Sequence, residues 1–291
     1  MENMVTDYIT LENESLRLQV ARTFGPRIVT LNSKGGANLL AELPDVVSER
    51  ADGKIYHFYG GHRLWLAPED LMRTYALDDA AVDVSETRDG LLVRKPVESE
   101  TGIEKSLHLA LAPREARLTV THCLANRGMA PVECAPWAIT QLCVGGVAIL
   151  PQARIPTGLL PNRALAIWPY TNVSSPHLTW GNRFLLVRAR EQLPFKVGFP
   201  NPRGWLAYWM DGTLFVKRAS CDAQAHYVDF GSSSECYCND RFIELETLGP
   251  LATLAPGSAL THTETWELHG NVGAPENEDA AQTIVDKLGL E

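Results

Sequence analysis

Hydrophobic and polar residues alternate in short runs along most of this chain, which is the pattern of β-strands. The runs lie at 8–11, 16–20, 27–31, 107–111, 117–124, 132–143, 147–149, 184–188 and 226–230. Asp89-Gly90 and Asp211-Gly212 each separate two strand-like runs. Asp-Gly favours a tight hairpin turn because both residues tolerate positive φ. The pattern therefore predicts antiparallel hairpins in series.

Helical spacing of apolar residues is confined to two places. One is a short segment at 68–72, and the other is the tail at 276–288, where Ile284 and Leu288 fall on one helical face with Ala280. No repeat of short period, low-complexity tract or linker interrupts the strands. We therefore expect one large antiparallel sandwich.

Composition narrows the range of partners. The chain has 291 residues and is 45% hydrophobic, which is enough for a large core. Its net charge is −9 and no basic cluster is present, so neither nucleic acid nor an anionic membrane surface is an expected partner. A neutral or weakly charged small molecule fits this balance better.

The cysteines and the N-terminal sequence indicate a cytoplasmic protein. The chain starts without a secretory signal pattern, and no apolar run approaches the roughly eighteen residues that span a bilayer. Six cysteines are present, and we expect reduced thiols. Cys236 and Cys238 share a strand face, but no second pair stands at zinc-site spacing, so no metal site is expected.

Two carboxylates lie on one face of a predicted strand at 242–248. Alternation points Phe242, Glu244 and Glu246 to one side and the aliphatic residues between them to the other. Such a face is either solvated or forms the floor of a polar pocket. On a rigid strand these carboxylates could be held in position for proton transfer.

A glycine pair at Gly60-Gly61 precedes three side chains that suit a sugar. His62 titrates near neutral pH, Arg63 offers a planar fork of donors, and Trp65 offers an apolar face. The alternative interpretation is a glycine turn with Trp65 in the core and Arg63 in a structural ion pair. The sequence leaves both open.

Other polar or aromatic positions carry a weaker signal. Trp137 is either a core residue or a stacking platform, and His226 is either a site residue or a structural group. Lys217, His262 and Glu264 lie in predicted strands and are expected on solvated faces. The nucleotide-binding, serine-hydrolase and zinc-protease motifs are absent from the sequence, so no cofactor is expected.

Several segments resemble the galactose mutarotase-like superfamily, which includes aldose 1-epimerases and hexose-6-phosphate epimerases, and the overall layout is similar to a bacterial branch of it. Segments 24–31 and 36–40 are similar to its opening hairpin, 60–65 to a segment that lines its sugar pocket, 245–247 to the strand that carries its catalytic glutamate, and 254–257 with 263–266 to its closing strand pair. The resemblance implies a large antiparallel β-supersandwich, all-β, as a single domain over 1–291 with a helical tail over 275–291. It also implies a small-molecule carbohydrate as ligand.

Two family features are missing. The family's general-acid histidine has no counterpart in segment 124–142, where Trp137 lies near the expected position. In addition, Leu248 replaces the glutamine that ends the family's Leu-Glu-Thr-Gln motif, which corresponds here to 245–248. Either His62 or His226 has taken over the acid's role, or the protein binds or senses a carbohydrate without this chemistry. A lyase or isomerase acting on sugar acids is a third reading, with Arg63 near the carboxylate.

The resemblance assigns roles for mutarotation, in which a base removes the anomeric hydroxyl proton while an acid protonates the ring oxygen. We expect Glu246 as the base and His62 as the acid. Substrate binding is expected from Arg63, Trp65, Glu244, Trp137 and His226. The sequence specifies neither the sugar nor the oligomeric state.

Overall fold

The computed structural model describes residues 7–154, 158 and 160–290, which form two large antiparallel sheets. The all-β sandwich predicted from alternation is confirmed. The first sheet contains, in spatial order, β1 (Tyr8–Glu12), β2 (Leu16–Ala21), β3 (Arg27–Ser33), β6 (His62–Ala67), β11 (Val132–Leu142), β20 (Ile243–Leu248), β19 (Ser234–Cys238), β16 (Phe195–Phe199) and β13 (Ala166–Ile167), with β21 (Ala252–Leu254) paired to β11.

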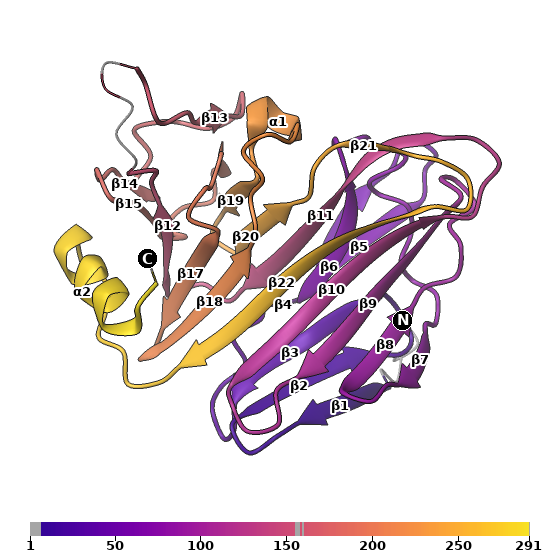
Figure 1. Ribbon diagram of the computed structural model, residues 1–291, viewed down its shortest axis with the longest axis horizontal. Coiled ribbons are helices and arrows are strands. Elements are labelled where there is room, and N and C mark those ends of the chain that lie inside the picture. Colours follow the sequence, from indigo (N-terminus) through magenta and orange to yellow (C-terminus); the bar gives the residue numbers. More distant parts are fainter. Residues whose placement is uncertain (1–6, 155–157, 159, 291) are drawn as a thin grey trace.

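The second sheet lies over the first, and Figure 1 shows its long strands passing across the face of the molecule. In spatial order it contains β14 (Leu178–Thr179), β15 (Phe184–Val187), β12 (Val147–Pro151), β17 (Trp205–Met210), β18 (Thr213–Ala219), β22 (Ala259–His269), β10 (Arg117–Asn126), β9 (Ile103–Leu111), β8 (Gly90–Arg94) and β7 (Asp83–Glu86). A separate ribbon of β4 (Glu42–Glu49) and β5 (Ile55–Gly60) completes the strands.

Helices are few and peripheral. α2 (Glu278–Leu288) begins at Asn277, whose side chain accepts from the backbone N–H of Ala280. It packs Ile284 and Val285 on the outer face of the second sheet. α1 (Val228–Gly231) is a single turn, so the strand expected at 226–230 was wrong. The short helix expected at 68–72 is a turn. Within the described residues, no helix is long and apolar enough to cross a membrane.

The main hydrophobic core fills the space between the sheets, and strand alternation builds it. On β10, Leu118, Val120, His122 and Leu124 are fully buried, while the alternate residues Thr119, Thr121 and Cys123 are more exposed. On β6 of the first sheet, Leu64 and Leu66 point into the same core. All six cysteines are free thiols.

A group of charged and polar side chains interrupts this core, and we call it the inner polar cluster. The Nζ of Lys217 lies 2.9 Å from a carboxylate oxygen of Glu264, and both side chains are fully buried. The ammonium also donates to the carbonyl oxygens of Ala138 at 3.0 Å and Leu245 at 2.9 Å on the first sheet. The remaining members are His62, His122, His262, Thr140 and Thr247.

The inner polar cluster corrects one sequence expectation. Lys217, His262 and Glu264 were expected on solvated faces, but their relative exposures are 0%, 7% and 0%. Alternation puts His262 and Glu264 on one side of their strand but does not tell which side faces the core. Burial opposes ionisation of Glu264, yet Lys217 and the two nearest histidines together hold the pKa of its carboxyl below the ordinary value.

Removing the ammonium of this pair should destabilise the protein strongly. Lys217→Met leaves the Glu264 carboxylate buried without its counter-charge, and we expect a loss of about 3–5 kcal/mol in the free energy of unfolding. Urea denaturation followed by tryptophan fluorescence measures it. The double variant Lys217→Met with Glu264→Gln should recover much of the loss, and Lys34→Met, at an exposed lysine, should change stability by less than about 0.5 kcal/mol. Equal losses in the single and double variants would contradict the pairing.

Candidate active site

The outer face of the first sheet carries another concentration of buried charge. On five neighbouring strands, β6, β11, β20, β19 and β16, alternate side chains enter the space between the sheets, and the side chains between them, most of them polar or aromatic, face outward. The outward set comprises Arg63, Trp65, Trp137, Ile139, Glu244, Glu246, Glu235, Tyr237 and Lys196. Because the pairing register is fixed, these side chains form one contiguous surface.

A cavity of about 430 Å³ lies on this surface, a size typical of small-molecule sites. The strands supply its floor, and the β4–β5 ribbon and connecting loops supply its walls. Its lining is rich in aromatic rings: Phe58, Trp65, Tyr75, Trp137, Tyr170, Tyr237 and Phe242. The titratable or charged groups among its lining residues, apart from the tyrosines, are Arg63, Glu69, Lys196 and Glu244.

Glu244 and Arg63 form an ion pair in the cavity. The guanidinium Nη2 lies 3.1 Å from Oε1 of Glu244, and the Glu244 side chain is 10% exposed. The guanidinium also stacks over Trp65, 4.2 Å from the ring centroid. Burial raises the pKa of Glu244 to about 7, with Arg63 opposing the rise and the charge of Glu246 adding to it. This carboxyl can therefore give or take a proton at neutral pH.

Lys196 is the centre of a second, deeper charge cluster. Its Nζ lies 2.7 Å from Oε2 of Glu235 and 3.0 Å from Oε2 of Glu246. The ammonium also sits against two indole rings, 4.5 Å from the centroid of Trp137 and 4.6 Å from that of Trp168. Burial opposes the charge of Lys196, but the two carboxylates raise its pKa well above the ordinary value. Lys196 is therefore a firmly held cation.

Glu246 and Glu235 face each other across the β19–β20 pair. Both are fully buried, and the indole N–H of Trp137 donates to Oε2 of Glu246 at 2.7 Å. Burial raises the pKa of Glu235 well above its ordinary value, despite Lys196. Oε1 of Glu246 and Oε1 of Glu235 have no hydrogen-bond partner among the described residues. The carboxylate-rich floor thus favours retention of a proton.

The structure brings four of the residues proposed from the sequence to this cavity, namely Arg63, Trp65, Trp137 and Glu244. Glu246 lies directly beneath, where it holds Lys196 and Trp137, and is not among the lining residues. His226 is exposed, and its carbonyl accepts from the backbone N–H of Leu251 outside the cavity.

His62 lies on the opposite face of the sheet from this cavity. Adjacent strand residues point to opposite sides, so Arg63 faces the cavity and His62 faces the core. Its Nδ1 lies 2.9 Å from the Thr140 hydroxyl and its Nε2 lies 2.7 Å from Nε2 of His122. Burial, and then the neighbouring His122, lower the pKa of His62 well below its ordinary range. This placement does not support its pairing with Glu246 as acid and base.

The inner polar cluster was also tested as a metal site, because ligand atoms of His62, His122 and Glu264 lie within 4.8 Å of one another. Each of these atoms already has a partner. Neutral His122 donates from Nδ1 to the carbonyl of His262, so its Nε2 accepts from His62. Glu264 accepts from Thr247, from the Trp266 indole and from Lys217. The Lys217 ammonium already provides the positive charge that balances Glu264, so these residues do not fit a metal ion.

Sequence reasoning missed Lys196, Glu235 and Tyr237. The sequence did carry a signal. Lys196 interrupts the run of apolar residues at 195–199, and Glu235 and Tyr237 occupy alternate positions of the strand at 234–238. A charged residue inside such a run indicates a buried partner on the outward face. Pairing these runs with the Glu244 strand was not possible without the strand order.

Comparison with solved structures places the fold. A candidate aldose 1-epimerase from Escherichia coli K12 superposes with a TM-score of 0.58 at 14% identity, covering 91% of this chain and 99% of that one. A galactose mutarotase-like protein from Lactobacillus casei gives 0.60 at 15%, covering 90% and 100%. The fold is that of the galactose mutarotase-like superfamily.

A third mutarotase-like structure, a candidate aldose 1-epimerase from Klebsiella pneumoniae, gives a TM-score of 0.59 at 9% identity, covering 98% of this chain and 83% of that one. No protein-family model matches the sequence, and no curated protein does. At these identities the similarity is one of fold.

The raised pKa of Glu244 has a consequence for stability. The folded protein binds more protons than the unfolded chain between the ordinary value of 4.5 and about 7, so this carboxyl's contribution is present at low pH and is lost as the pH rises through 7. Relative to Glu244→Gln, wild type should therefore lose stability on the order of 3 kcal/mol between pH 4.5 and pH 8. Chemical denaturation of both proteins across this range measures the difference. The control variant Glu86→Gln, at an exposed carboxyl, should differ from wild type by the same amount at every pH. If the stability difference between wild type and Glu244→Gln were also independent of pH, the shifted pKa would be contradicted.

Proposed function

We propose that this protein is a carbohydrate-active isomerase of the aldose 1-epimerase type, which exchanges sugar anomers in the 430 Å³ cavity. The observation that carries the proposal is Glu244, a carboxyl with a pKa of about 7 that lines an aromatic-rich cavity beside a held cation. The galactose mutarotase-like fold supports a sugar as the ligand. Aromatic walls suit the apolar faces of a sugar ring, and the polar groups suit its hydroxyls.

In this proposal Glu244 is the base that removes the proton from the anomeric hydroxyl. Its pKa near the working pH is the value at which a carboxyl serves best in both directions of a reversible proton transfer. Arg63 holds its Oε1 at 3.1 Å, which fixes the carboxyl's orientation toward the cavity. Glu244 thus takes the role that the sequence resemblance assigned to Glu246.

Lys196 supplies the acid in place of the missing histidine. Its ammonium lines the cavity and can give a proton to the ring oxygen as the ring opens, when that oxygen becomes strongly basic. The ring then closes on the other face of the carbonyl carbon, Lys196 recovers its proton from the ring hydroxyl, and Glu244 returns its proton to the new anomeric oxygen. Glu246 and Glu235 act through Lys196, because they hold its Nζ at 3.0 and 2.7 Å.

The second candidate function is a non-catalytic carbohydrate-binding or sensing protein on the same fold. One observation favours it: the described residues that line the cavity include no histidine, and Glu244 is tied to Arg63 by an ion pair. The two candidates differ in whether the bound sugar changes its anomer. Exchange of freshly dissolved sugars, followed by polarimetry or one-dimensional NMR, separates them.

Removing either proton-transferring group should abolish most of the turnover. We expect Glu244→Gln and Lys196→Met each to lower anomer exchange at least about 10²-fold, as is usual for a general acid or base. Glu86→Gln, at an exposed carboxyl on the distant β7, should leave exchange unchanged. A thermal melt identifies any variant that fails to fold. Full exchange activity in folded Glu244→Gln would show that this carboxyl is not the base.

The pH dependence of exchange should follow ionisation of Glu244. The base is active when ionised, so the exchange rate should rise with pH through about 7 and level off above it. Two-dimensional exchange NMR between pH 5 and pH 9, corrected for the uncatalysed rate, measures the profile. A profile that is flat across this range, or that rises only below pH 5, would argue against Glu244.

A further inference from the structure

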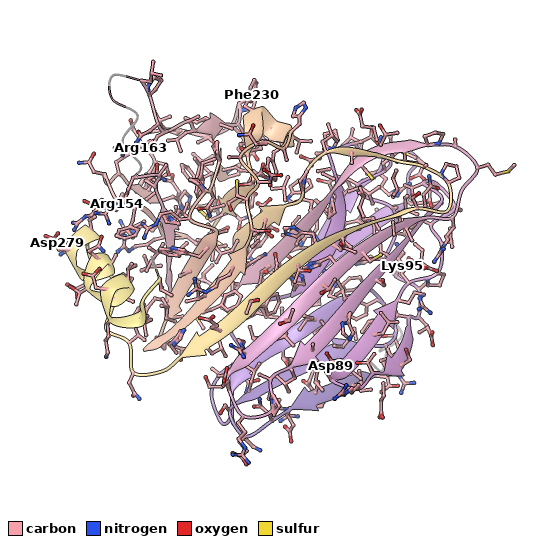
Figure 2. The ribbon with its side chains drawn as sticks, in the orientation of Figure 1. Asp89, Lys95, Arg154, Arg163, Phe230 and Asp279 are labelled. Carbon is pink, nitrogen blue, oxygen red and sulfur yellow. The ribbon has the colours of Figure 1, made fainter. Side chains whose placement is uncertain are left out.

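An exposed aromatic side chain near the cavity is carried by a strained segment of backbone. Asp229, Phe230 and Gly231 have successive φ values of 49°, 58° and 87°, and the first two are non-glycine residues in the left-handed region. Phe230 is 95% exposed, and Figure 2 shows it at α1, on the edge of the molecule. A left-handed backbone is unfavourable for a bulky residue, and such strain concentrates at binding sites.

Phe230 borders a second, smaller hollow. Its volume is about 140 Å³, and its lining residues are Ala166, Ile167, Trp168, Pro169, Asp229 and Phe230. Two aromatic side chains and one carboxylate-bearing residue thus meet in a space that admits a single ring. No lysine or arginine lines this hollow, so an anionic group has no counter-charge there.

The hollow adjoins the main cavity through one short segment. Trp168 lines the hollow, while its ring lies 4.6 Å from Nζ of Lys196, which lines the main cavity. Pro169 lines the hollow, and the next residue, Tyr170, lines the main cavity. The two spaces therefore share the wall built by 168–170.

We propose that this hollow is a second sugar subsite, so that the ligand is a reducing disaccharide or longer saccharide rather than a free monosaccharide. The inference rests on the proposed function of the main cavity. Anomer exchange needs a free anomeric hydroxyl, which places the reducing-end ring beside Glu244. The preceding ring then lies against Phe230 and Trp168, with the Asp229 carboxylate accepting from its hydroxyls.

The features of the hollow favour a sugar over a protein partner. A sugar ring presents apolar C–H groups to an aromatic face and hydroxyls to a carboxylate, and both groups are present here. The small volume suits one ring, whereas a stable protein interface needs more than about 1,000 Å² of contact. Because the hollow and the main cavity lie against the same segment, 168–170, two sugar rings joined by one glycosidic bond can occupy both.

The test compares saccharides that differ by one ring. Affinities are measured by calorimetry for D-glucose, D-galactose and D-mannose, and for maltose, cellobiose, lactose and mannobiose. At least one disaccharide should bind about tenfold more tightly than its reducing-end monosaccharide, the gain expected for one stacking contact. Phe230→Ala should abolish that gain and leave monosaccharide affinity unchanged. Met129→Ala, at a residue 99% exposed outside both lining sets, should change neither.

Three outcomes would overturn the subsite. The first is that no disaccharide binds more tightly than its monosaccharide, which includes the case in which none binds. The second is that Phe230→Ala leaves every disaccharide affinity unchanged. The third is that Phe230→Ala changes the molar mass in solution by light scattering while disaccharide affinity stays constant, which would assign Phe230 to a protein interface. Asp229→Asn, which keeps the shape of the hollow, should weaken the same disaccharide.

The subsite and the isomerase proposal can fail separately. Exchange of monosaccharide anomers, together with disaccharide affinities that Phe230→Ala leaves unchanged, would keep the isomerase and reject the subsite. Disaccharide binding that depends on Phe230, without anomer exchange, would keep the subsite and favour the non-catalytic binding protein.

Discussion

Two buried ammonium groups hold strand β20 from opposite faces of the first sheet. Lys217 reaches from β18 in the second sheet to the backbone carbonyls of Ala138 and Leu245 on β11 and β20. Lys196, on the outer face, binds Glu246 of β20 and Glu235 of β19. A buried ammonium is costly unless acceptors surround it, so each lysine fixes the strands that supply those acceptors. β20 is held from both faces, and this fixes the position at which Glu244 enters the cavity.

The protonation state of the cavity follows from its count of charges. The outer face places the three carboxyls Glu235, Glu244 and Glu246 near only two cations, Arg63 and Lys196. Full ionisation would leave an uncompensated negative charge in a buried region, so the group favours keeping one proton. This excess of negative charge contributes to the raised pKa values of Glu244 and Glu235. Within the described residues of this site, proton transfer at neutral pH thus needs no histidine.

Alternation in the sequence predicted the strand-rich sandwich and the common face of Glu244 and Glu246, because side-chain period is a local property. The expectation that His62 and Arg63 serve the same site did not apply that period, since adjacent strand residues point to opposite faces of a sheet. Local patterning could not show that Lys196 lies beside Glu246, since that contact depends on the order of β16, β19 and β20. Nor could it show that Lys217 and Glu264 face the core, because charged residues are usually exposed.

The strand order also constrains how the molecule is made. β22 lies between β18 and β10, and its Glu267 pairs with Arg117, 150 positions earlier in the sequence. β20 likewise joins β11, which precedes it by about a hundred residues. A growing chain on the ribosome therefore cannot close either sheet until β20 and β22 have emerged, and contacts of this range make folding slow. Until then one edge of β10 and one edge of β11 lack their strand partners, and unpaired edges of this kind are prone to aggregation.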